Sequence, residues 1–154
     1  MIGFAFDGYP VYGSYAYSSA NNTASSIKLM VSSYALRNIT LRTTLSNGTT
    51  LSSAYYGPPV NSTYPLGSYL QDYQYVSGYG DLDAYNGRYG KTPEYPSGTY
   101  AYFATVDSTY TPQYPFIIGP SFYGAPVSSN MGTGSGSASI TETVTAYYSY
   151  TSSG

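Results

Sequence analysis

The sequence contains no cysteine, no histidine and no tryptophan. Without cysteine there is no disulfide framework, so a location outside the cell needs other support. Without histidine and cysteine, Ser-His and Cys-His nucleophile arrangements, imidazole metal sites and thiolate metal sites are all excluded. Only carboxylate chemistry remains available, and we predict that the protein is not an enzyme.

Charge is also scarce: charged residues make up 8% of the 154 residues, and the formal net charge is −2. Nucleic-acid-binding domains carry basic clusters and membrane anchors carry polybasic runs, and the chain has neither. No apolar run is long enough for a membrane span or a signal peptide. The glycine-rich stretch 132–137 lacks the Lys-Ser/Thr ending of a phosphate-binding loop. We expect no nucleic-acid partner, no membrane span and no cofactor.

The chain is instead rich in hydroxyl groups, with 23 tyrosines and abundant serine and threonine. Alternating runs separated by Gly, Pro and Asn predict β-strands nearly throughout, and the length suits one domain. We predict a mainly β fold. Residues 1–127 would form a single antiparallel β-sandwich-like domain with at most one short helix. A Gly/Ser-rich linker follows at 128–137, and a long C-terminal strand at 138–154.

Local patterns place several elements within this domain. Apolar residues recur at helical spacing in 27–36, which predicts the only helix. Two alternating runs, 35–45 and 49–56, meet at Asn47-Gly48, a dipeptide that favours the positive φ angles of a hairpin turn.

Two further strands are predicted, at 98–107 and at 114–120, and the second is short and fully apolar, as a buried strand would be. Tyr-Pro pairs break the chain between runs, because proline is confined to strand edges and turns. One or more of these bonds is a candidate for the cis form. The four pairs begin at Tyr9, Tyr64, Tyr95 and Tyr114.

The segment ASITETVTAYYSY, residues 138–150, alternates apolar residues with threonine and serine. As a strand it would span roughly 40 Å, at about 3.3 Å per residue. Two destinations remain open: an ordinary last strand in its own sheet, or the exposed sheet edge of a neighbouring molecule. In the second case the self-assembly face would consist of Ile140, Val144, Ala146, Tyr148 and Tyr150.

Four of the seven asparagines stand in N-x-S/T sequons. N-linked glycans there would supply solubility that the missing charges do not, and they would require a secreted route. Turn-forming asparagines beside a common Ser or Thr explain the same pattern without glycans. The candidate glycosylation sites are Asn21, Asn38, Asn47 and Asn61.

The seven acidic residues show no spacing that singles out a glycosidase pair. Asp81 and Asp83, followed by Asn86, offer oxygen ligands for calcium on a turn, with Glu94 downstream. The spacing departs from an EF-hand loop, and Asx side chains that cap their own turn explain the same residues without an ion. We therefore assign no metal site and keep calcium as an alternative.

Three blocks, FDGYPVYG at 6–13, LDAYNGR at 82–88 and TPEYPSGTYAYF at 92–103, resemble the YHYH-domain proteins. The resemblance covers about residues 2–124, in order, and implies a secreted or surface protein of a largely uncharacterised family, with no established reaction. Where the family name has histidines after tyrosine, this chain has Ala101 and Phe103. Members usually have sequence before the GFAFDG block, so we expect a chain that is incomplete or processed at its N-terminus.

These observations favour a structural function. We expect an N-glycosylated subunit of an extracellular fibre or surface assembly, a homopolymer joined by β-strand addition. The alternative is a secreted saccharide-binding module, because flat tyrosine rings stack on sugars. This alternative includes a form in which calcium stabilises the module. Tyrosine is also an ordinary strand residue whose half-buried ring suits a sheet that is poor in charge.

Overall fold

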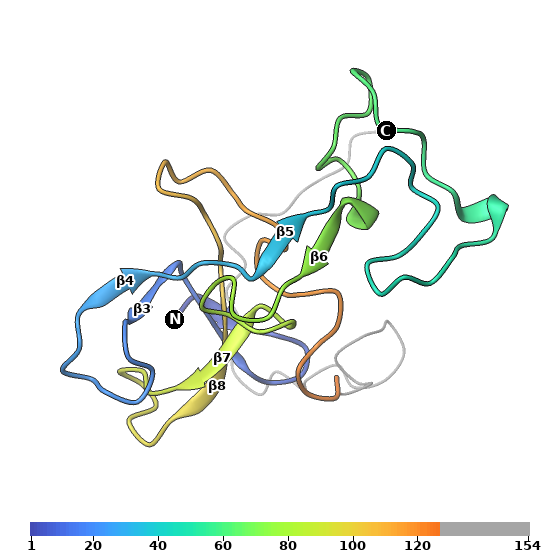
Figure 1. Cartoon of the computed structure of the whole chain (residues 1–154). Helices are drawn as coiled ribbons and strands as arrows, with labels where there is room; N and C mark the ends of the chain where they lie inside the picture. The colour runs from blue at the N-terminus through green and yellow to red at the C-terminus, as the bar shows by residue number, and fades with distance from the viewer. Residues whose placement is uncertain (127–154) are drawn as a thin grey trace, which may run out of the picture.

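The strand predicted at 98–107 forms the centre of the molecule. The computed structural model describes residues 1–126, and β8 (Thr99–Phe103) lies there between β2 (Pro10–Tyr12) and β7 (Gly87–Gly90) (Figure 1). With β1 (Gly3–Phe4) they form a four-stranded sheet of order β1-β2-β8-β7. β2 pairs in parallel with β8, and the other two pairings are antiparallel.

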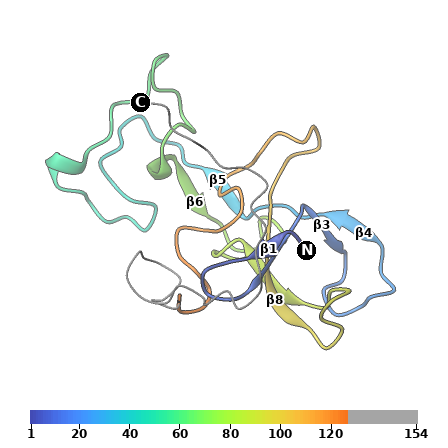
Figure 2. The same cartoon turned by 180° about the vertical axis from the view of Figure 1, so that it is seen from behind.

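Two smaller sheets complete the strand structure. β3 (Tyr15–Tyr17) pairs antiparallel with β4 (Ile27–Leu29), and β5 (Tyr34–Leu36) pairs antiparallel with β6 (Tyr73–Tyr75). The predicted mainly β fold is confirmed: within residues 1–126 the only helical elements are the 3-10 turns η1 (Ser53–Tyr55) and η2 (Leu70–Asp72). Figure 2 shows the chain between β5 and β6 extending away from the central sheet as a lobe of loops.

The core has two parts because successive residues of β8 face opposite sides of the sheet. Ala101 and Phe103 are buried on one side, and Tyr100 and Tyr102 are buried on the other. The buried partners are Tyr12, Met30 and Leu82 on the first side and Val11 on the second. The central strand therefore leaves no face open to solvent.

A buried ion pair holds the lobe between β5 and β6. Arg42 Nε lies 2.7 Å from Asp72 Oδ1, and both side chains are 0% exposed. Arg42 also donates hydrogen bonds to the backbone carbonyls of Pro58 (2.6 Å) and Pro65 (3.0 Å). Three separate stretches of the lobe are thus tied to one guanidinium, which compensates for the near absence of sheet pairing there.

The helix predicted at 27–36 is wrong. Ile27–Leu29 is strand β4 and Tyr34–Leu36 is strand β5. Between them, the hydroxyls of Ser32 and Ser33 donate to the carbonyls of Tyr114 and Leu82. These partners lie far along the chain, so tertiary pairing overrides the helical spacing of the apolar residues.

The buried strand predicted at 114–120 is also wrong. The N–H groups of Phe116 and Ile117 bond back to the carbonyls of Gln113 (2.8 Å) and Pro115 (2.9 Å), which makes turns. Phe116 has a φ of 72° and is 52% exposed. The expectation of a cis Tyr-Pro bond is confirmed at Tyr114–Pro115.

The hairpin predicted around Asn47-Gly48 forms, but it is short. Thr44 and Thr50 make an isolated antiparallel bridge, and Gly48 has the expected positive φ, 84°. Beyond it, the N–H groups of Gly57 and Val60 bond to the carbonyls of Arg42 and Thr40. The chain therefore curves around Arg42 instead of continuing as a regular ladder.

The predicted linker at 128–137 and the C-terminal strand at 138–154 lie outside the described residues. The proposed self-assembly residues lie outside them too: Ile140, Val144, Ala146, Tyr148 and Tyr150. Within residues 1–126, no helix has the length and apolar character needed to cross a membrane.

Candidate functional site

The turn at 82–88 is built by its own polar side chains. Asp83 Oδ1 accepts the backbone N–H groups of Tyr85 (2.9 Å) and Gly87 (3.1 Å). Asn86 has a φ of 64°, and its Nδ2 donates to the carbonyl of Phe103 at 2.9 Å. The Asx-turn interpretation is confirmed, and Asn86 fixes the turn against the end of β8.

The candidate calcium ligands do not converge. Asp81 Oδ1 lies 2.8 Å from Lys28 Nζ, and Asp81 Oδ2 accepts the backbone N–H of Val31 at 3.0 Å. Glu94 instead contacts Tyr12, on another part of the surface. Among residues 1–126, no three His, Cys, Asp or Glu side chains gather closely enough to hold a metal ion.

Two buried tyrosines of β8 bond to carboxylates. Tyr100 Oη donates to Asp83 Oδ1 at 2.9 Å, and Tyr102 Oη donates to Asp7 Oδ2. The ring of Tyr123 stacks on Tyr100, with centroids 3.7 Å apart. Burial, and then the adjacent carboxylates, raise the pKa of Tyr100 and of Tyr102. Both hydroxyls stay protonated and donate, so this cluster is a rigid hydrogen-bonded support with no activated nucleophile.

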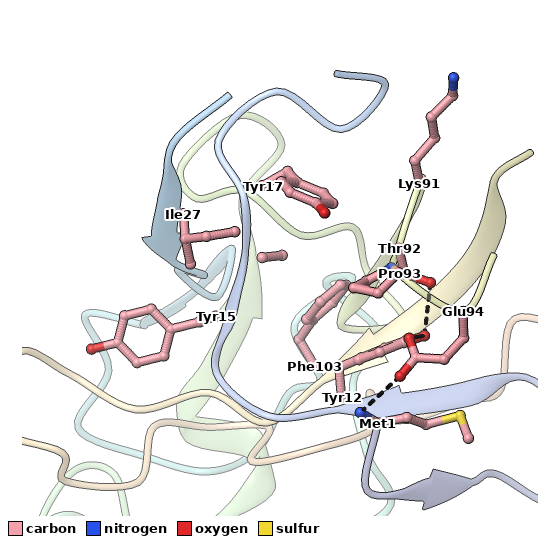
Figure 3. Close-up of a pocket in the computed structure, with 11 residues that line it drawn as sticks. Met1, Tyr12, Tyr15, Tyr17, Ile27, Lys91, Thr92, Pro93, Glu94 and Phe103 are labelled. Atoms are coloured by element: carbon pink, nitrogen blue, oxygen red, sulfur yellow. Dashed lines mark hydrogen bonds and ion pairs between the residues drawn. The ribbon is translucent and has the colours of Figure 1, made fainter. Parts of the chain in front are cut away.

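An open pocket lies beside the other face of β8 (Figure 3). It has a volume of about 190 Å³. Figure 3 shows Tyr17 and Ile27 on one side and Pro93 and Glu94 on the other, with Phe103 at the base. The pocket therefore joins the β3–β4 sheet to the loop that precedes β8.

One wall of this pocket carries the polar atoms. Tyr12 Oη lies 2.8 Å from Thr92 Oγ1 and 2.8 Å from Glu94 Oε2. Burial raises the pKa of Tyr12 to about 12, so its hydroxyl stays protonated at neutral pH and can donate a hydrogen bond. That hydrogen bond lowers the pKa of Glu94, which keeps the carboxylate ionised. The α-amino group of Met1 lies 3.6 Å from Glu94 Oε1.

A second feature is the aromatic face of the β5–β6 sheet. Tyr34 and Tyr75 face each other across the strands, and Tyr73 stacks on Tyr114 with centroids 4.2 Å apart. Two hollows, of about 350 and 250 Å³, share Tyr34, Tyr73 and Tyr114 as lining residues. Within the described part of the chain, no third strand pairs with this sheet.

The four candidate glycosylation sites all lie on the surface, at Asn21, Asn38, Asn47 and Asn61. Asn47 Oδ1 accepts the N–H of Thr49 at 3.0 Å, and Asn61 Oδ1 accepts the N–H of Thr63 at 2.9 Å. In both, the side-chain oxygen faces the backbone while the nitrogen, which would carry a glycan, has no bond to any residue of 1–126.

Sequence reasoning missed both the pocket and the aromatic face. Glu94 lies far along the chain from Tyr12 and Tyr17, and no motif links it to them. The only sequence signal was that Glu94 and Phe103 belong to one block, TPEYPSGTYAYF, whose two ends border the same pocket.

The fold and its surface define a small, mainly β domain organised around one tyrosine-rich central strand. The sequence model of the YHYH protein family matches residues 1–116, which include that strand. The chain therefore belongs to the YHYH family, as its sequence blocks predict. Comparison with curated proteins and with solved structures finds no match.

Proposed function

We propose that the protein is a structural subunit of an extracellular fibre or surface layer, N-glycosylated and joined to its neighbours by β-strand addition. The observation that carries the proposal is the β5–β6 sheet, which combines two strands, an aromatic face and two hollows. Strand addition uses main-chain bonds for affinity and pockets for alternate side chains as the source of specificity.

The backbone of β6 offers such an edge. Val76 N–H bonds to the Ser33 carbonyl, so Tyr75, paired with Tyr34, falls in the alternate position of the antiparallel ladder. In that position the N–H and C=O groups point away from the partner strand. No residue of 1–126 bonds the N–H or C=O of Tyr75. An incoming strand can therefore pair there.

The occupant we propose is the C-terminal segment 138–150 of a neighbouring copy. Its alternating apolar residues match what a hollowed, aromatic sheet face accepts, and its only charged residue is Glu142. The face itself is poor in charge, since Asp107 is the one ionisable carboxylate that lines either hollow. Burial of tyrosine and aliphatic side chains would then drive association, at about 25 cal/mol per Å² of apolar area.

Surface composition supports assembly as well. Many large apolar side chains of residues 1–126 are more than one-third exposed, including Leu36, Leu70 and Phe116 near the β5–β6 sheet. Large exposed apolar patches on soluble domains mark interaction surfaces. Exposed sequons at Asn21, Asn38 and Asn61 support a secreted route in which glycans keep the remaining surface hydrated.

The test is imaging of the purified chain with and without residues 138–154. We expect fibres or ordered layers from the full chain and monomers from the truncated chain. A Tyr75→Lys variant should also stay monomeric, because it places a charge at the accepting edge. Tyr55→Lys, a change at a 73% exposed tyrosine in η1, is the matched control and should assemble normally. Undiminished assembly without the tail would refute the proposal.

A further inference from the structure

We propose that the pocket between β3 and Thr92–Glu94 binds one neutral pyranose unit of a saccharide. The site lies in the region of Figure 3 and shares no lining residue with the hollows of the β5–β6 sheet. The proposal therefore does not depend on strand addition, and either can fail without the other.

The size of the pocket sets the size of the ligand. At about 190 Å³ it is smaller than the sites of roughly 300–1,000 Å³ that enclose drug-sized molecules. A single six-membered ring suits this space, with the rest of a chain extending into solvent. Tyr15 and Ile27 at the rim are 48% and 58% exposed, so the mouth is open to such an extension.

The wall formed by β3 and β4 offers an apolar, aromatic surface. Tyr17 borders the pocket from β3, together with Ala16 and Ile27. Most tyrosines near the core make edge-on or stacked contacts with other rings, but the ring of Tyr17 has no ring partner among residues 1–126. No other ring covers this half-buried side chain, so the proposal assigns its ring to the C–H face of a sugar, which packs on aromatic rings as other apolar groups do.

The opposite wall supplies hydrogen bonds. Glu94 is oriented by Tyr12 Oη, 2.8 Å from its Oε2, and Thr92 Oγ1 lies at the same distance from that hydroxyl. An ionised carboxylate accepts strong hydrogen bonds from ligand hydroxyls. The Met1 α-amino group beside Oε1 is partly exposed and screened by water, so a hydroxyl can replace it.

The charge of Glu94 selects the kind of sugar. Acidic sugars would place a second carboxylate next to it, which is repulsive. Lys91 also borders the pocket, but Figure 3 shows its side chain extending away from the cavity. One apolar wall and one hydrogen-bonding wall fit a molecule with an apolar face and a hydroxyl edge, which describes a neutral pyranose.

The experiment is an NMR titration of the full-length Tyr75→Lys chain, which stays monomeric and leaves the lining of this pocket unchanged, with methyl glucoside, N-acetylglucosamine, glucuronate and choline as probes. We expect saturable shifts of the Ala16 methyl and Phe103 amide signals with at least one neutral sugar, and none with glucuronate. Tyr17→Ala should weaken binding about tenfold, because stacking and apolar burial are lost together. Glu94→Gln should also weaken it, and Tyr55→Ala, the exposed-tyrosine control, should not.

Three results would overturn the proposal. One is the absence of saturable shifts with both neutral sugars in a chain whose spectrum shows it to be folded. Another is sugar binding that Tyr17→Ala leaves unchanged. The third is saturable binding of choline without any sugar binding, which would make the pocket a cation site formed by aromatic rings and a carboxylate.

Discussion

Arg42 and Asp72 form a buried, bidentate ion pair, in which Arg42 Nε lies 2.7 Å from Asp72 Oδ1 and Arg42 Nη2 lies 2.8 Å from Asp72 Oδ2. Asp72 Oδ2 also accepts the N–H groups of Gly67 and Tyr69. Burial by itself would raise the pKa of Asp72, but these hydrogen bonds, Arg42 first, lower it overall. The lobe between β5 and β6 is therefore organised by electrostatics instead of by a sheet.

Removing one partner of this pair should destabilise the protein strongly, because the other charge is left buried and unpaired. We expect Arg42→Ala to lower Tm by roughly 10 °C or more. Lys28→Ala, which breaks the more exposed pair with Asp81 at 2.8 Å, is the control and should change Tm little. Equal effects of the two substitutions in thermal melts would contradict this account.

Stability should fall in alkali because of Tyr100 and Tyr102. Burial raises the pKa of both hydroxyls in the folded state. Their contribution is complete below the unfolded value, about 10, and is lost as pH rises toward the folded values. Urea unfolding should therefore show a falling midpoint above about pH 10, and the fall should be shallower in Tyr102→Phe. Ionisation of every tyrosine at its ordinary pKa, followed by absorbance while the chain stays folded, would argue against it.

Phe103 is a core residue at a position where the family name has histidine, and it is 3% exposed. Phe103→His should cost about 2–4 kcal/mol, from lost apolar contacts and a polar ring without a partner. Its stability should drop further below about pH 6.5, since burial lowers the folded pKa of such a histidine. Phe103→Leu should cost about 1 kcal/mol without that pH dependence. Urea unfolding of both variants at neutral and acidic pH measures these costs. If Phe103→His costs the same at both pH values, the explanation is contradicted.

Asn47 borders the smaller hollow of the β5–β6 sheet, so a glycan there and a donated strand would compete for space. In material assembled by a glycosylating host, we expect Asn47 to carry the least glycan among the four sequons. Glycopeptide mass spectrometry measures this occupancy directly. Asn47→Gln should leave assembly unchanged, with Asn61→Gln as the comparison. Full occupancy of Asn47 within fibres would place the accepting strand elsewhere.

Local sequence predicted features that depend on neighbouring residues. The alternation in TYAYF identified β8, the Asp83 and Asn86 side chains formed the turn that they suggested, and Asn47-Gly48 reversed the chain. The helix at 27–36 failed because Ser32, Ser33 and β5 find partners from distant parts of the chain. Periodicity carries no record of such partners.

The sequence by itself determined the class of this protein: mainly β, poor in charge, without histidine or cysteine chemistry, and a member of the YHYH family. These properties follow from composition, alternation and short motifs, which act locally. Only the tertiary structure decided that Tyr17 and Glu94 border one pocket, and that Tyr34, Tyr73 and Tyr114 border two hollows. Those surfaces arise where distant segments pack together, because burial of apolar area is indifferent to separation along the chain.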